Sequence, residues 1–222
     1  MMMNIFSIFD PITSKMFSLN WLSMIIIFLL LPTQYWIIPS RLMILWIHSI
    51  NYIFKEFKIL IKYSFSNLII FISLMIMIFF NNFLGLFPYI FTASSHMSFC
   101  MSLSLSLWMG MMTYSIINYL NNLLTHLTPQ GTPTLLMPFM VIIESISLII
   151  RPITLSIRLT ANMIAGHLLL SLLGSSGQLI SNMIMMNILF LSQIILFILE
   201  ISVSMIQAYV FSILSTLYSS DS

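Results

Sequence analysis

Charged side chains are scarce in this sequence, and their scarcity excludes most soluble folds. Asp, Glu, Lys and Arg make up 5% of the 222 residues, whereas 60% are hydrophobic and the mean hydropathy is +1.09. A soluble domain carries about 25% charged residues, so this chain could not cover a globule in water. Its apolar runs are continuous and do not alternate as the strands of a membrane barrel do. We therefore expect an all-α integral membrane protein.

Cysteines and catalytic motifs are also missing. Cys100 is the single cysteine, so no disulfide can form within the chain. The sequence has no phosphate-binding glycine loop, no cluster of metal ligands and no nucleophile with its base. We therefore predict no catalytic residue, no metal, no cofactor and no enzymatic activity in this chain. The formal net charge of +2 gives no indication of a nucleic-acid partner.

The hydrophobic pattern predicts one membrane domain, residues 1–222, with about five transmembrane helices and one surface helix. A helical crossing takes about 20 apolar residues. The expected crossings are residues 16–31, 67–88, 97–120, 133–173 and 182–218. The start of the chain lacks the basic region of a secretory signal. We expect the chain either to be made beside its membrane or to insert through its own helices.

Residues 40–63 differ from the crossings because basic side chains recur in them. Lys55, Lys58 and Lys62 have i, i+3, i+7 spacing, which puts them on one face of a helix. This pattern favours an interfacial amphipathic helix lying on the membrane, either as a solvated connection or as a basic seat for anionic lipid or a peripheral stalk. By the positive-inside rule, this connection, the 121–133 loop and the C-terminus lie inside, and the N-terminus and the 174–178 turn lie outside.

The last two apolar segments are too long to cross a bilayer upright. As helices, residues 133–173 and 182–218 would be about 60 and 55 Å long, against a hydrocarbon layer of about 30 Å. Steep inclination of the two helices as a hairpin is one solution. A break at Arg151-Pro152 is the competing one, since proline removes a helical hydrogen bond. In that case Arg151 and Arg158 would be interfacial anchors.

Polar residues in these two segments are the candidate functional residues. A charge at the centre of a membrane helix costs at least about 3 kcal/mol, so such residues mark ion or substrate paths by default. Glu144, Arg151 and Arg158 have i, i+7, i+14 spacing and share one face, with Asn162 near Arg158. His167 points to roughly the opposite face. The second segment carries one polar stripe of Glu200, Ser204 and Gln207.

The register of the two segments can be tested against these residues. Antiparallel neighbours have a constant sum of residue numbers, and the pairs Arg158 with Gln207 and His167 with Glu200 have nearly equal sums. A turn over residues 174–182 predicts a smaller sum. Either the helices are offset or their connection is longer, and the sequence leaves both open.

Four runs closely resemble the mitochondrial form of the F-type ATP synthase subunit a family, and arthropod members resemble the chain most. These runs are Arg158–Leu169 (RLTANMIAGHLL), Glu200–Phe211 (EISVSMIQAYVF), Phe9–Pro11 (FDP) and Asn82–Tyr89 (NFLGLFPY). The resemblance covers nearly the whole chain. It implies a long, strongly inclined hairpin of the last two helices against a rotating ring of c subunits.

The resemblance also implies a function and partners. The expected protein is the stator proton-channel subunit of the membrane (F0) sector, a non-catalytic, multi-pass protein of the mitochondrial inner membrane. Its expected partners are the c-subunit ring, other F0 and peripheral-stalk subunits, and the lipid bilayer. Two offset half-channels would carry protons to and from ring carboxylates and so couple proton flow to ATP synthesis.

The candidate residues take separate roles in this hypothesis. Arg158 is the fixed cation that separates the half-channels, because guanidinium does not deprotonate at any relevant pH. His167 and Glu200 belong to the outer half-channel and Glu144 to the inner one. Asn162 and Gln207 are polar neighbours of Arg158. No catalytic role is assigned to Arg151, where many family members carry an uncharged residue.

Two other functions remain alternatives from sequence. A self-contained ion transporter or a respiratory-complex pump subunit usually shows an intramembrane Lys or Glu in each of several helices, often with repeats. A structural scaffold would tolerate neutral residues in place of Arg158 and Glu200.

Overall fold

The computed structural model describes residues 5–13, 17–61, 65–128, 133, 135–177 and 182–221, and in these ranges it contains helices and no strand. Met16, Lys62, Tyr63 and the central part of the expected 174–182 connection lie outside the described residues. The helices are η1 (Ile5–Phe9), η2 (Leu19–Leu22), α1 (Ser23–Leu30), α2 (Arg41–Leu60), α3 (Phe65–Gly85), η3 (Ala93–Ser95), α4 (Met97–Asn118), α5 (Leu120–Leu127), α6 (Met137–Ser176) and α7 (Met183–Asp221).

Four of these helices are long and apolar enough to cross a membrane. They contain the candidate spans Asn67–Gly85, Met97–Asn118, Met137–Ser176 and Met183–Ser219, and a shorter apolar helix covers Leu19–Leu29. This helical, apolar architecture confirms the predicted fold class, an all-α membrane protein.

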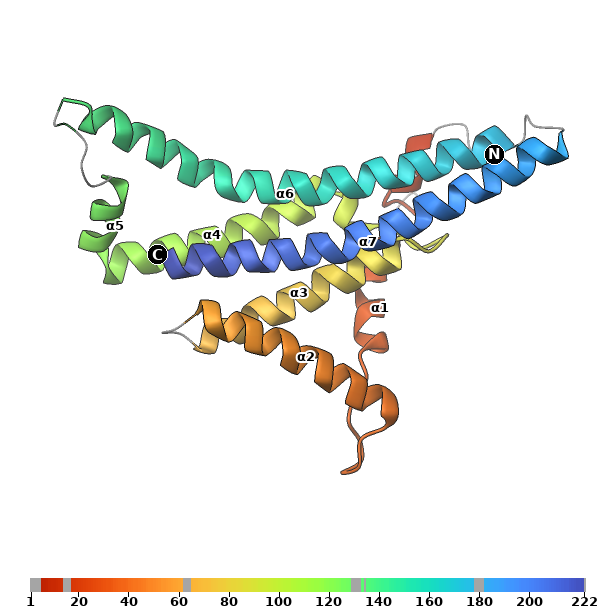
Figure 1. The fold of residues 1–222 in the computed structure, drawn as a ribbon, viewed down its shortest axis with the longest axis horizontal. Helices are drawn as coiled ribbons and strands as arrows, with labels where there is room; N and C mark the ends of the chain where they lie inside the picture. The colour runs from red at the N-terminus through yellow and green to blue at the C-terminus, as the bar shows by residue number, and fades with distance from the viewer. Residues whose placement is uncertain are drawn as a thin grey trace.

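Helix α6 continues through Pro152 without a break. Proline has no N–H to donate to the carbonyl of Leu148, so one helical hydrogen bond is missing there. The Pro152 ring is buried against the rest of the bundle, and Figure 1 shows α6 bowed along its length. The alternative of two separate crossings joined at Arg151-Pro152 is therefore wrong for this structure.

Two local boundaries differ from the sequence prediction. The expected 121–133 loop contains helix α5, whose apolar Leu120, Leu123, Leu124 and Leu127 have helical spacing. The turn expected to begin at Gly174 begins later, because α6 includes Gly174 and continues to Ser176. Glycine weakens a helix by only about 1 kcal/mol, which the surrounding apolar residues offset.

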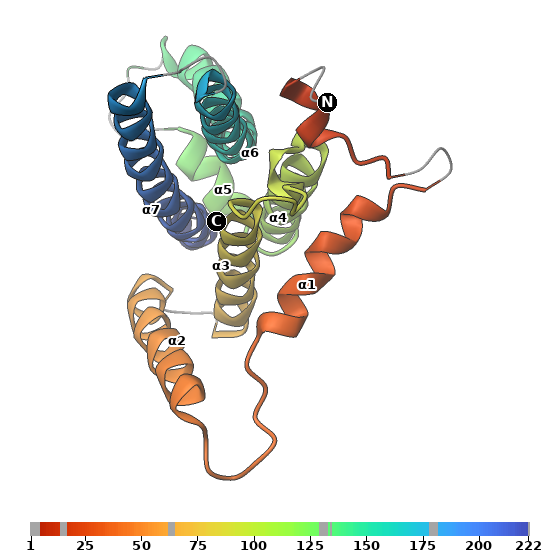
Figure 2. The same cartoon turned by 90° about the vertical axis from the view of Figure 1, so that its right-hand side faces the viewer.

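Helix α3 lies at the centre of the bundle. It packs mainly against α7 and also contacts α2 and α1, while α4 packs mainly against α6. Seen along the long axis in Figure 2, α1 and α2 lie on opposite sides of α3. One buried cluster joins Leu74 and Ile78 of α3 to Leu155 and Leu159 of α6 and to Phe211 of α7. This packing holds α6 and α7 against a common support.

Helix α2 is anchored mainly by its C-terminal part. Phe57 is fully buried and packs with Leu68 and Phe71 of α3. One residue earlier, the Glu56 carboxylate accepts a 3.0 Å hydrogen bond from the Tyr209 hydroxyl of α7. A hydrogen bond to the same carboxylate raises the pKa of the exposed Tyr52. Helix α2 is thus tied both to α3 and to α7.

Hydroxyl groups inside the apolar helices are satisfied locally. Ser104, Ser115, Ser156, Ser204 and Ser212 each donate to the carbonyl oxygen three residues earlier. This pattern lets serine lie within a helix without an unpaired hydroxyl hydrogen, which explains why so many serines fit a membrane span.

We expect Phe57→Ala to weaken the attachment of α2 because it leaves a cavity where the ring was. Truncating a buried Phe costs about 3–5 kcal/mol in a well-packed core. Phe54→Ala is the matched control, because the Phe54 side chain is 36% exposed. Thermal unfolding of the purified protein should show a clear loss for F57A and little for F54A. Equal losses would contradict the packing described here.

Candidate functional site

Arg158 lies on the exposed face of α6, in the central part of the helix. Among the described residues, no carboxylate of the chain comes within 4.0 Å of its guanidinium group. Asn162, one turn further, is half-buried. The side chain of Arg158 is therefore presented to whatever covers this face of the helix.

Gln207 is half-buried on α7, and no hydrogen bond joins it to Arg158 in the described part of the chain. Two of the three residues of the polar stripe expected on α7, Glu200 and Ser204, are buried. The expected neighbourhood of Arg158 and Gln207 stays a prediction.

Glu200 of α7 packs tightly against Gly166 of α6. A Cβ atom placed on Gly166 would lie 2.8 Å from Oε1 and 2.9 Å from Cδ of Glu200, so a larger residue at this position would force the Glu200 side chain to move. Glu200 is 7% exposed, and neither carboxylate oxygen has a hydrogen-bond partner among the described residues. The contact with Gly166 is one residue away from the expected pairing of Glu200 with His167, which favours the offset register.

His167 lies beside this contact and faces the N-terminal segment. Its ring meets the Phe9 ring edge-on, with centroids 6.4 Å apart. The Nε2 atom is buried and has no hydrogen-bond partner in the ranges that the structure describes. His167 lies nine residues before α6 ends at Ser176, so His167 and Glu200 place three buried polar atoms toward the C-terminal end of α6.

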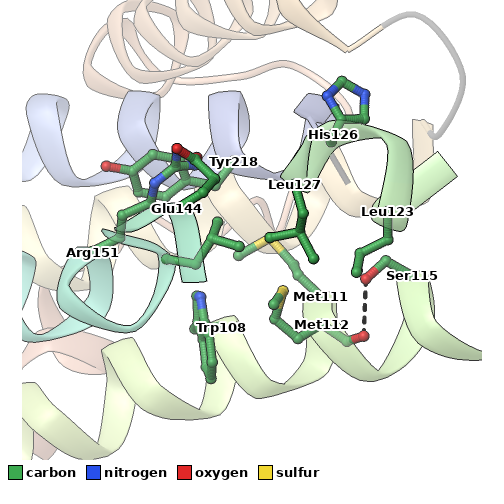
Figure 3. A pocket seen from close by; sticks show the side chains of 11 residues that line it. Trp108, Met111, Met112, Ser115, Leu123, His126, Leu127, Glu144, Arg151 and Tyr218 are labelled. Carbon is green, nitrogen blue, oxygen red and sulfur yellow. Dashed lines mark hydrogen bonds and ion pairs between the residues drawn. The ribbon is translucent and has the colours of Figure 1, made fainter. Parts of the chain in front are cut away.

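Glu144 lies at the opposite end of α6, on the wall of a cavity of about 280 Å³. The cavity is lined from α4, α5, α6 and α7, and Figure 3 shows Glu144 and Arg151 next to the Tyr218 ring. The Nη2 atom of Arg151 is 3.7 Å from Oε1 of Glu144. The Arg151 guanidinium carbon is 4.9 Å from the centroid of Tyr218. Arg151, to which we assigned no role, thus contacts one of the candidate residues.

A second group of buried polar side chains was missed in the sequence. Asn81 and Asn82 of α3, Ser94 of η3 and His96 each have a buried side-chain atom without a hydrogen-bond partner among the described residues. The centroid of the His96 ring lies 5.2 Å from the ring centroids of both Trp21 and Phe91. Two consecutive asparagines within an apolar run were the available signal, because amides are costly in hydrocarbon.

The described residues contain no group of three or more His, Cys, Asp or Glu side chains that could hold a metal ion.

Comparison with known proteins decides the family. The family described as "ATP synthase A chain" matches residues 16–220. Curated relatives named "ATP synthase subunit a" are 55% identical in Drosophila melanogaster and 51% identical in Anopheles gambiae, each covering 100% of this chain and 99% of the relative. A Locusta migratoria protein of the same name is 54% identical over the same shares. The chain belongs to the ATP synthase A chain family.

Membership of the ATP synthase A chain family agrees with the resemblance noted in the sequence. The two strongest motif runs lie on facing helices of the structure. The run beginning at Arg158 is in α6 and the run beginning at Glu200 is in α7, and they meet where Gly166 contacts Glu200. The two motif runs of this family member thus meet at the packing of Gly166 against Glu200.

We expect Gly166→Ala to push α6 and α7 apart, because its new methyl group would overlap the Glu200 side chain. Overpacking of this kind costs about 1–3 kcal/mol. Thermal unfolding of the purified protein should show the loss. The matched control is Gly174→Ala in the same helix, where an added Cβ meets nothing within 4 Å.

A second substitution tests the cause of that loss. Glu200→Asp shortens the side chain by one methylene and should restore part of the stability when combined with G166A. If G166A unfolds at the same temperature as G174A, the close approach described here is wrong.

Proposed function

We propose that this chain is the stator proton-channel subunit of the membrane sector of a mitochondrial ATP synthase, situated in the inner membrane. The single observation that carries the proposal is Arg158, an exposed arginine in the middle of an apolar helix, with no carboxylate of the described residues within 4.0 Å of its guanidinium group. Such a charge is stable in a membrane only with an anionic partner or water.

The partner in this proposal is a carboxylate on a ring of c subunits that rotates past α6 and α7. A permanent cation attracts each arriving ionised carboxylate and opposes direct proton flow past it. Because guanidinium stays charged at any relevant pH, Arg158 cannot itself relay a proton. It therefore keeps the outer and inner proton routes separate.

His167 and Glu200 form the outer half-channel in this proposal. Both groups can bind and release protons, and their buried polar atoms lie about two helical turns from Arg158, counted along α6. Protons pass from the outer side along these groups to a ring carboxylate. Asn162 and Gln207 carry no charge and act as hydrogen-bonding neighbours of Arg158.

Glu144 belongs to the inner half-channel. It lies about four turns before Arg158 on α6 and lines a cavity that reaches α4, α5 and α7. After the ring has rotated, protons leave the ring carboxylate and pass Glu144 to the inner side. Along the axis of α6, Arg158 thus lies between Glu144 and the position that Glu200 of α7 contacts, and it prevents direct proton transfer between the two carboxylates.

The energetics explain why this chain works with a ring and performs no chemistry on ATP itself. Moving one charge through 100 mV yields about 2.3 kcal/mol, so several protons are needed for each ATP. A stepping ring adds these contributions together, while the peripheral stalk and other F0 subunits hold this chain still. The reaction of ATP takes place elsewhere in the complex.

Replacing Arg158 by Ala should abolish coupled ATP synthesis, since nothing else would separate the two routes. The assembled complex in liposomes with an imposed proton gradient provides the measurement. The control is Lys55→Ala, which removes an exposed cation of α2 and should keep coupling. Full coupling in R158A would refute the role of Arg158.

Replacing Glu200 by Gln should slow proton transport at least about tenfold, because a relay that cannot bind a proton loses a general acid–base contribution. ATP-driven acidification of the same liposomes measures the rate. Glu56→Gln, a carboxylate on the surface helix α2, should keep most of the rate. Normal pumping by E200Q would remove Glu200 from the outer half-channel.

A further inference from the structure

The cavity at the inner end of α6 contains a charged side chain, Arg151, that the proposed proton path does not use. Its polar lining comes from four helices: Ser115 of α4, His126 of α5, Glu144 and Arg151 of α6, and Tyr218 of α7. The rest of the lining is apolar, including Trp108, Met111 and Leu148. Arg151 is the one side chain in this lining that contacts Glu144 by an ion pair and a second helix by its flat face (Figure 3).

Arg151 makes two contacts through its guanidinium group. Nη2 lies 3.7 Å from Glu144 Oε1, two turns earlier on the same helix. The guanidinium carbon also lies over the Tyr218 ring, 4.9 Å from its centroid, within the distance at which a cation is attracted to an aromatic face. The Arg151 side chain is 30% exposed and that of Glu144 is 41% exposed.

This geometry differs from that of an arginine that anchors a helix in lipid headgroups. Such a side chain extends toward the membrane surface, whereas Arg151 folds onto α7 and into the cavity wall. The surroundings of Arg151 also differ from those of Arg158, two turns further along α6. Arg158 is exposed and has no carboxylate within ion-pair distance in the described ranges. The two arginines of α6 therefore have different surroundings.

We propose that Arg151 is a positioning residue for the inner half-channel, where it holds the Glu144 carboxylate at the cavity wall while the Tyr218 ring holds Arg151. This inference rests on the proposed function, in which Glu144 receives protons released by the ring. The contacts of Arg151 with Glu144 and with Tyr218 direct the Glu144 carboxylate into the cavity and keep α7 in register with α6 at this end.

The other groups around the cavity do not replace Arg151. The α4 lining of Trp108, Met111, Met112 and Ser115 contains no titratable side chain. Helix α5 contributes His126, and α7 contributes the side chain of Tyr218. A permanent cation next to Glu144 is thus supplied, within this lining, by Arg151.

The test compares single and double variants of the complete ATP synthase complex in liposomes. Arg151→Gln should lower the initial rate of ATP-driven proton pumping roughly fivefold, which corresponds to about 1 kcal/mol. Arg151→Lys keeps the charge and should retain most of the rate. Tyr218→Leu, which removes the ring, should lower the rate, while Tyr218→Phe should retain most of it. Lys55→Gln makes the same change in net charge on the exposed face of α2 and is the matched control.

The double variant separates positioning from a merely structural role. If Arg151 acts through Glu144, then R151Q combined with Glu144→Gln should pump no more slowly than E144Q alone. The amount of assembled complex should equal that of K55Q in every case. If the two effects multiply, or if R151K pumps as slowly as R151Q, Arg151 does not position Glu144.

The same set of variants distinguishes this inference from the proposed function. Normal pumping by E144Q would remove Glu144 from the proton path, and both proposals for this cavity would fail together. Slow pumping by E144Q with normal pumping by R151Q would overturn the positioning role alone.

Discussion

A guanidinium group in an apolar helix keeps its charge at every relevant pH, and this constraint governs the whole molecule. The surroundings of this permanent charge differ between the two arginines of α6, Arg151 and Arg158. Arg151 has Glu144 and the Tyr218 ring beside it, so its charge is balanced within the chain. Arg158 is exposed and has no carboxylate of the chain in ion-pair range among the described residues. Only in the second arrangement is the charge left to be met by water or by an anion from outside the described residues.

The other helices support α6 and α7 in positions that make this exposure possible. Helix α3 fills the space behind them with Leu74, Ile78 and their neighbours, and α2 is bonded to α7 through Glu56 and Tyr209. At one end Gly166 allows α6 and α7 to approach over the Glu200 side chain. At the other end, residues of α4 and α5 line a cavity together with residues of α6 and α7. Buried or cavity-lining polar groups therefore lie on both sides of Arg158 along α6.

Much of this architecture could be predicted from the sequence because continuous apolar runs specify membrane helices directly. The amphipathic α2 followed from lysines at helical spacing, and the fold class followed from the scarcity of charge. Gly174 misled one boundary prediction, whereas Pro152 raised only the competing alternative to the continuous helix that the structure shows. A proline ring is tolerated where it packs against neighbours, and a glycine need not end a helix whose other residues remain apolar.

Contacts between helices were harder to predict, because they depend on how the helices are rotated and offset. The sequence pointed to His167, Glu200 and Glu144 as polar residues in hydrocarbon, but gave no means to find Phe9 beside His167 or Tyr218 beside Arg151. The buried amides of Asn81 and Asn82 carried a usable signal, two adjacent polar residues within an apolar run. His96 lies in the loop before α4, and nothing in the sequence indicated that its ring contacts those of Trp21 and Phe91.

The most direct test of the account is a structure of the complete complex by electron cryomicroscopy, at a resolution that shows the Arg158 guanidinium. The account predicts that this group faces a carboxylate of a neighbouring ring subunit, within the range of about 4–6 Å over which opposite charges interact strongly. A guanidinium lying among lipid headgroups, or paired with a carboxylate of its own chain, would contradict it.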